Sequence, residues 1–137
     1  MILEHYNAVK ALLPATVRVH MWSVPDGAQY PYVVLWGDLG EESSGGPDGD
    51  ALADVPDVLS LRIRATCVGL TGDSLLILAR NVRAALNRKT PTVTDWHPGK
   101  LRQSVLMDAQ TDTDVTLTGG GHPIFAVDEF ALVSHKL

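Results

Sequence analysis

Residues 59–88 read LSLRIRATCVGLTGDSLLILARNVRAALNR, and this stretch decides the fold class. From Leu59 to Cys67 apolar and polar side chains alternate, which places the odd-numbered residues on one apolar face of a strand. The even-numbered residues between them, two of which are arginines, form a polar face. The alternation predicts a strand with one face toward a core, and Gly69 ends it.

A helix is expected directly after this strand. Thr71 is suited to cap its N-terminus, and Asp73 lies in the first turn, where the helix dipole favours negative charge. The helix is expected to run to about Arg88, with Arg80 and Arg83 off its apolar face. That face is a stripe at helical spacing formed by Leu75, Leu78, Ala79, Val82 and Leu86, with Leu76 or Ala85 beside it.

The remaining elements are predicted from shorter patterns. Residues 2–12 have apolar side chains at helical spacing, and Pro14 stops this short helix. Strands are expected over residues 16–22, 31–37, 112–118 and 124–134, and residues 92–110 read as a strand pair or extended segment broken at 97–99. The sequence therefore predicts one α+β domain over residues 1–137, with a mostly antiparallel sheet, the long helix on one face and a short N-terminal helix.

One segment departs from this pattern. Residues 38–57 hold seven of the chain's 16 acidic residues and no Lys or Arg, together with a run of Ser, Gly and Pro. A loop of this length suggests function or disorder. The rest of the chain has nine acidic residues and 11 Lys and Arg. The formal net charge of −5 therefore comes from residues 38–57.

Composition excludes several classes of protein. The chain has 137 residues, 45% of them hydrophobic, and would bury about two thirds of its unfolded surface, enough for a real core. Cys67 is the single cysteine, so an internal disulfide is impossible. No apolar run approaches the ~20 residues of a membrane span, and the N-terminus lacks signal-peptide features. We expect a soluble protein, kept inside a cell and without a whole-chain basic surface for nucleic acid.

No motif assembles an active site. The five histidines lack the spacing of a zinc site, and Gly119-Gly120-Gly121 lacks the lysine of a phosphate loop. Asp48-Gly49-Asp50 begins like a calcium loop, but the pattern fails at Ala51-Leu52. We therefore expect no catalytic residue, no cofactor, no metal and no enzymatic activity.

Two charged features remain as candidates. Arg62 and Arg64 project from the same strand face, where they could bind carboxylates of a partner chain or of the acidic loop, or form a solvated face with weak ion pairs. Asp112 and Asp114, close to three consecutive glycines, predict an acidic hairpin tip, which is either an ordinary turn or a contact site.

Taken in order, these features span residues 2–134 and resemble the pattern of a known family. The features are the early helix with Leu12-Leu13-Pro14, the run Tyr30-Pro31-Tyr32-Val33-Val34-Leu35, the long loop, the strand 59–64, Gly69 and the helix ending near Leu86, Gly99-Lys100-Leu101, the acidic Asp112 and Asp114, and the strand 125–133. In this order they resemble the tail terminator proteins of long-tailed phages, meaning the lambda-type terminators and related minor tail or tail-completion proteins of actinobacterial phages. Head-tail connector and neck proteins of the same size overlap with this pattern.

The resemblance implies a structural virion protein, made in the host cytoplasm, with no enzymatic activity and no membrane contact. Family members form homohexameric rings on the head-proximal end of the tail tube. The ring stops tube polymerisation and offers a docking surface for the head connector, while DNA passes through its lumen without specific binding. Tail-tube protein, head connector and the chain itself are then the expected partners.

We choose the candidate residues of such a ring by their charge. A negatively charged lumen repels the DNA phosphates, so the DNA can slide through it. The partner- or lumen-facing candidates are Glu41, Glu42, Asp48, Asp50, Asp54, Asp112 and Asp114. Between subunits we expect Arg62 and Arg64 to meet the acidic loop, or the terminal strand to pair at its edge with a neighbour. The alternative functions are a head-tail connector or neck protein, a small acidic binding module of the immunity or adaptor type that acts on a basic partner, and an enzyme that uses carboxylates and a histidine.

Overall fold

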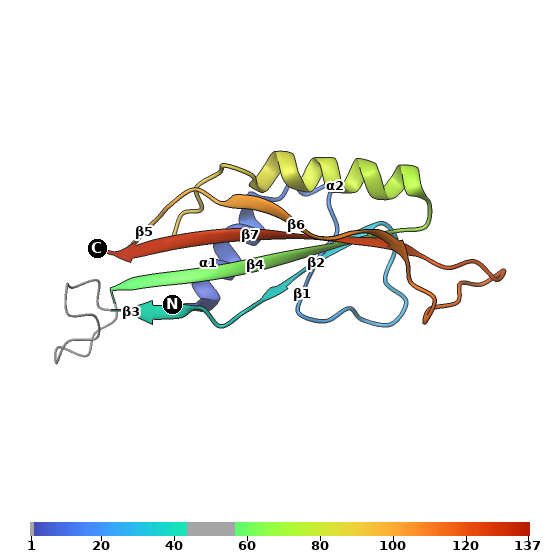
Figure 1. Cartoon of the computed structure of the whole chain (residues 1–137), viewed down its shortest axis with the longest axis horizontal. Helices are drawn as coiled ribbons and strands as arrows, with labels where there is room; N and C mark the ends of the chain where they lie inside the picture. Colours follow the sequence, from blue (N-terminus) through green and yellow to red (C-terminus); the bar gives the residue numbers. More distant parts are fainter. Residues whose placement is uncertain (1, 44–56) are drawn as a thin grey trace.

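The computed structural model of the chain describes residues 2–43 and 57–137, so the candidates Asp48, Asp50 and Asp54 lie outside the described residues. The described residues form two helices and seven strands (Figure 1). In chain order these are α1 (Ile2–Leu12), β1 (Val19–Met21), β2 (Tyr32–Gly37), β3 (Glu41–Ser43), β4 (Val58–Gly69), α2 (Gly72–Leu86), β5 (Trp96–Pro98), β6 (Arg102–Thr111) and β7 (Ile124–Lys136).

All the described strands belong to one sheet, in the order β1-β2-β4-β7-β5. The long strands β4 and β7 pair antiparallel along almost their whole length, from Val58–His135 to Gly69–Ile124. β3 lies beside the first residues of β4, and β6 lies beside β7 on the same side as β5. β1 pairs parallel to β2, whereas the other described pairings are antiparallel, so the sheet is mixed rather than uniformly antiparallel.

Both helices pack against the same face of this sheet. Leu61 and Ile63 of β4 and Phe130 of β7 are almost completely buried on that face. The helices contribute Tyr6 and Val9 from α1 and Leu75, Leu78, Val82 and Leu86 from α2. In Figure 1, α2 runs along the upper side of the sheet and α1 lies behind it. The opposite face of β4 and β7 carries no described helix.

Several predicted elements are confirmed. The first helix spans residues 2–12 as predicted, and the odd-numbered residues from Leu59 to Cys67 are all buried. Thr71 caps α2 by accepting a hydrogen bond from the backbone N–H of Ser74, whose hydroxyl in turn accepts from the backbone N–H of Thr71. Such a capping box fixes where α2 begins. The apolar stripe on α2 lies in the core, but Leu76 beside it is exposed.

Other predicted elements were wrong. Only residues 19–21 of the predicted 16–22 strand are paired, and residues 112–118 form turns instead of a strand. His97 and Pro98 lie inside β5, although they were predicted to break a strand pair. β5 and β6 do not pair with each other, because each pairs with β7. Within the predicted 38–57 loop, residues 41–43 form β3.

One polar contact joins α2 to the sheet. Arg83 donates from Nε to Asp128 Oδ2 at 2.7 Å and from Nη2 to Asp128 Oδ1 at 2.9 Å. Asp128 lies on β7 opposite Ala65, on the core side of the sheet, and its side chain is only 7% exposed. A bidentate Arg–carboxylate pair has a fixed geometry, so this contact sets how α2 lies across β7.

Candidate interaction surface

The two arginines of β4 lie on the helix-free face but in different environments. Arg64 Nε lies 3.1 Å from Glu129 Oε2 on β7, and its guanidinium carbon lies 5.0 Å from the ring centroid of Trp36 on β2. These contacts hold Arg64 within its own sheet. Arg62 is exposed, and within residues 2–43 and 57–137 its side chain forms no ion pair. Of the two predicted inter-subunit residues, Arg62 is therefore the more available.

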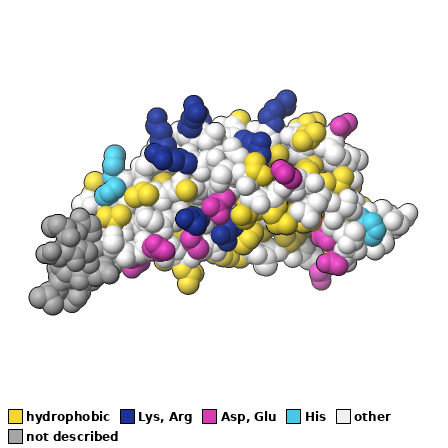
Figure 2. Space-filling view, viewed as in Figure 1, with side chains coloured by type: hydrophobic (Ala, Val, Ile, Leu, Met, Phe, Trp, Pro, Cys, Tyr) yellow, Lys and Arg dark blue, Asp and Glu magenta, His cyan; other side chains and the backbone are white. Residues whose placement is uncertain are grey.

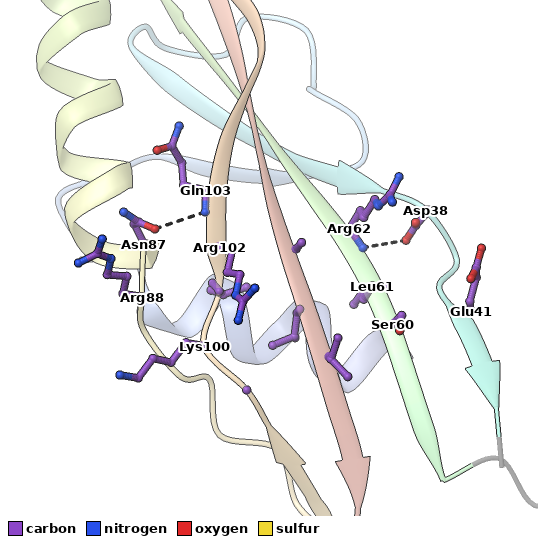
Figure 3. Close-up of a pocket in the computed structure, with 15 residues that line it drawn as sticks. Asp38, Glu41, Ser60, Leu61, Arg62, Asn87, Arg88, Lys100, Arg102 and Gln103 are labelled. Atoms are coloured by element: carbon purple, nitrogen blue, oxygen red, sulfur yellow. Dashed lines mark hydrogen bonds between the residues drawn. The ribbon is translucent and has the colours of Figure 1, made fainter. Parts of the chain in front are cut away.

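Arg62 lies in a concave surface that crosses the helix-free face. This surface, which we call the basic trough, has a cavity volume of about 1250 Å³. Four cationic and two acidic side chains line it: Arg62, Arg88, Lys100, Arg102, Asp38 and Glu41. Figure 3 shows Arg88, Lys100 and Arg102 on one side of the trough and Glu41 on the other, with Arg62 beside Asp38. The charges thus leave an excess of positive over negative groups.

The chain path after α2 brings three of these cations together. Arg88 adopts a φ of 63°, in the left-handed region, and its backbone N–H donates to the carbonyl of Leu101. Leu101 donates in return to the carbonyl of Lys89, so the end of α2 lies beside the start of β6. Asn87 supports this arrangement, since its Oδ1 accepts from the backbone N–H of Gln103 at 3.3 Å (Figure 3).

Sequence reasoning did not assign the trough. Arg88 was predicted only as the approximate end of the helix, and Lys100 entered only through the resemblance. Arg88 lies more than ten positions before Lys100 and Arg102 in the sequence, and the backbone pairing of Arg88 with Leu101 brings it beside them. The one available signal was the density of basic residues over positions 88–102.

The acidic wall of the trough comes from β3 and the turn before it. Glu41 lies opposite Ser60 of β4, which places it on the helix-free face, and Glu42 lies opposite Leu59. Both side chains are exposed. Asp38 has a structural role, because its Oδ1 accepts from the backbone N–H groups of Gly40 at 3.1 Å and Arg62 at 3.0 Å. Glu41 and Glu42 are thus the described acidic residues of this segment that remain open to a partner.

The connection between β6 and β7 forms a second acidic feature, the acidic finger, which comprises residues 112–122. Asp112 organises its base, since its Oδ1 accepts from the backbone N–H of Asp114 at 3.1 Å and its own N–H donates to the carbonyl of Pro123. Nδ1 of His122 lies 2.7 Å from the carbonyl oxygen of Val115. Asp114 is exposed, and the finger contains no Lys or Arg. Figure 1 shows it extending past one end of the sheet.

The sheet edges correct one further prediction. β7, the terminal strand, pairs with β4 on one side and with β5 and β6 on the other. It lies inside the sheet and has no free edge for most of its length. On the far side of β7, the free edge is formed by β5 and by β6, and in β6 Val105, Leu106 and Met107 are each exposed by at least 40%.

His5 and Cys67 lie in the interior of the described structure. Nε2 of the buried His5 lies 2.8 Å from Ser134 Oγ, and its ring contacts Trp96 edge-on. Burial raises the pKa of the Cys67 thiol to about 12, with a further contribution from Asp128. Among the residues that the structure describes, no three His, Cys, Asp or Glu side chains gather in a way that could hold a metal ion. Neither described helix is long and apolar enough to cross a membrane.

Figure 2 shows how charge is distributed on one face of the molecule: Lys and Arg side chains project along the upper edge, over α2 and beyond its C-terminal end. A second group of basic side chains lies next to acidic ones near the centre of the same view. On this face, basic side chains thus gather along one edge even though the whole chain is acidic.

Comparisons with known proteins identify the fold but no family. No known family matches the sequence, and no curated protein matches it. The fold is similar to that of a chain in the structure of the virion of a native gene transfer agent particle, with a TM-score of 0.55 and 14% sequence identity. The match covers 91% of this chain and 84% of that chain. The architecture described above is thus similar, over nearly its whole length, to that of one component of that particle.

Proposed function

We propose that this chain is a structural virion protein that works by assembling with other virion proteins, rather than an enzyme. The observation that carries the proposal is the shared fold with a chain of a gene transfer agent virion over 91% of this sequence. The charged trough, the acidic finger and the free edge of β6 give it several separate surfaces with which to meet partners.

Within that class, we propose the more specific role of a tail terminator. The chain would form a homohexameric ring on the head-proximal end of the tail tube, stop tube polymerisation and dock the head connector. A ring needs two different, complementary surfaces on each subunit, because head-to-tail contacts continue until they close. The basic trough and the acidic finger would meet this requirement, and they lie on different parts of the described structure.

The acidic side chains have a role in this proposal. DNA that passes through a ring slides best past a surface that repels its phosphates. Glu41 and Glu42 are exposed on β3, so they are proposed to face the lumen or the tube. Asp112 and Asp114 of the finger are proposed to face the lumen, the tube or a neighbouring subunit.

Reconstitution with the tail-tube protein of the same virus tests the terminator role. Tubes assembled alone should grow to variable lengths, whereas addition of this chain should stop growth and leave ring-shaped density at one end in electron micrographs. A chain that binds only the portal-side components, and leaves tube growth unchanged, would be a neck or connector protein. A chain that binds neither, but binds an unrelated basic protein as a monomer, would be a binding module.

Charge reversal tests the role of β3 in an assay of head-tail joining. Glu41→Lys with Glu42→Lys should reduce head-tail joining at least tenfold, because DNA or the tube surface would then meet positive charge. The matched control is Asp26→Lys with Asp73→Lys, which changes the net charge equally at exposed positions outside the trough, the finger, β3 and β6. Normal joining by the β3 variant would refute this role for Glu41 and Glu42.

A further inference from the structure

The cations of the trough are not neutralised within the part of the chain that the structure describes. The described ion pairs are Arg64–Glu129 and Arg83–Asp128, and neither involves Arg62, Arg88, Lys100 or Arg102. Four unpaired cations around one concave surface of about 1250 Å³ form a positive field that favours an anionic partner.

The composition of the trough favours an acidic protein segment over a nucleic-acid backbone. Glu41 lines the opposite wall, where a continuous phosphate backbone would be repelled. A short acidic segment that approaches from the side of Arg88, Lys100 and Arg102 avoids that wall. Because Glu41 belongs to the trough, the β3 edge of a second copy would bring like charges together, so it is the poorer occupant.

The acidic finger fits this requirement. Asp114 is exposed, Asp112 is fixed at its base, and no Lys or Arg lies between residues 112 and 122. The finger extends past one end of the sheet, whereas the end of α2 and the start of β6, which carry the cations, lie toward the other end (Figure 1). A chain cannot place its own finger in its own trough across that length, but a neighbouring copy can.

We propose that the acidic finger of one copy docks in the basic trough of the next, and that Asp114 meets Lys100 and Arg102 there. The contact joins two different surfaces, so each subunit donates one finger and receives one, which allows closure into a ring. This inference rests on the proposed ring-forming function and identifies the subunit interface. It assigns Arg62, Arg88, Lys100 and Arg102 to one binding surface.

Paired charge reversals test the contact, with native mass spectrometry of the full chain at several concentrations as the readout. The trough variant is Lys100→Glu with Arg102→Glu. The finger variant is Asp112→Asn with Asp114→Lys, in which the asparagine retains the acceptor at the base of the finger. Each variant should weaken subunit association at least tenfold, and a chain that carries all four changes should recover most of that loss.

Mixing the two variants gives a sharper result. The intact finger of the trough variant fits the intact trough of the finger variant, and the reversed finger fits the reversed trough. An equimolar mixture should therefore assemble again, with the two variants alternating, although neither variant assembles well alone. The matched control, Lys10→Glu with Arg80→Glu, changes the same number of exposed cations on α1 and α2 and should assemble like the wild type. Association of the wild type should also weaken between 0.15 and 1 M salt, where the Debye length falls from about 8 to about 3 Å.

Cross-linking locates the contact directly. A chain with Thr118→Cys in the finger and Lys100→Cys in the trough should form a ladder of covalent oligomers with a short bis-maleimide, because both positions are exposed. The native Cys67 is buried and should not react. The control pairs Thr118→Cys with Lys10→Cys, which lies on α1 and should give no ladder.

The outcomes separate this inference from the proposed function. Rings that form normally in all reversal variants, together with no ladder in the Thr118–Lys100 pair, would overturn the finger-to-trough contact and leave the ring function standing. A wild-type chain that stays monomeric at every concentration, and also on tail tubes, would overturn both. Weakening in the two reversal variants without recovery in the combined chain would also overturn the direct contact.

Discussion

Replacing Arg83 by methionine tests most directly how α2 is held on the sheet. Asp128 is 7% exposed, and its other described side-chain donor is Gln103, whose Nε2 lies 3.4 Å from Oδ1. Loss of the guanidinium would therefore leave a buried carboxylate with one long hydrogen bond. Breaking a fully buried pair in this way costs about 3–5 kcal/mol. The Arg83 side chain is 44% exposed, so water reaches the pair, and we expect a loss of about 2–3 kcal/mol.

The double variant distinguishes a lost pair from lost packing. Arg83→Met with Asp128→Leu removes both charges and fills the space with apolar groups, so no carboxylate remains unpaired. Its free energy of unfolding should lie within about 1 kcal/mol of the wild type. The double variant should therefore be more stable than the Arg83→Met variant, although it carries one more substitution in the core.

Equilibrium unfolding in urea at one fixed protein concentration measures these differences. For a chain of this size, the Arg83→Met loss corresponds to a fall in Tm of about 6–12 °C. Two results would refute the reasoning. One is a loss below about 0.5 kcal/mol for Arg83→Met, which would mean that Asp128 is effectively solvated. The other is a double variant as unstable as the single one.

Three further predictions follow from single positions. Cys67 should react with an alkylating agent at pH 8 at least 100-fold more slowly than a free thiol, because burial raises its pKa to about 12. The ordinary pKa of a cysteine thiol is 9.0, so as the pH rises the unfolded chain loses the thiol proton before the folded chain does. The free energy of unfolding should therefore fall between pH 9 and 12. In urea titrations, the Cys67→Ala variant should lack the contribution of the thiol to this decrease. Gly37→Ala should cost about 2 kcal/mol or more in thermal unfolding, since the added Cβ would lie 2.2 Å from the carbonyl oxygen of Arg62; unchanged stability would disprove that close approach. Thr71→Ala should cost about 1 kcal/mol, and Thr71→Ser much less, because serine keeps the acceptor for the Ser74 N–H.

Local patterns were enough to predict the elements whose periodicity is strong. β4 alternates over nine residues and lies at the centre of the sheet, so one face had to be apolar. α2 has both a capping residue at Thr71 and a stripe of aliphatic side chains. In each case the short-range preference and the tertiary environment favour the same structure.

The errors arose where pairing over long sequence distances decides the structure. Pro98 was interpreted as a break, but β5 pairs only with β7 among the described strands, and proline is tolerated on an edge strand, where its missing N–H removes no ladder bond. β1 is parallel to β2 because residues 22–31 lead the chain back before it pairs. Neither arrangement is encoded in the alternation of the strands themselves.

The charged surfaces were predicted only in part, for a related reason. Arg62 and Arg64 share a strand face as predicted, yet the Arg64 side chain contacts Glu129, which is 65 positions away. Similarly, Asp128 has an acidic side chain on the core side of β7, which single-strand patterns do not explain without Arg83. The availability of a charge depends on partners that only the folded chain brings near.

The position of β7 in the sheet has a consequence for how the protein is made. β7 follows the other six described strands in the chain, yet it pairs with β4, β5 and β6. During synthesis, β4 must therefore wait for more than fifty residues before its main partner leaves the ribosome. Until then one edge of β4 stays unpaired, which is a state prone to non-native association. Subunits competent for the proposed assembly should accordingly appear only after β7 has emerged.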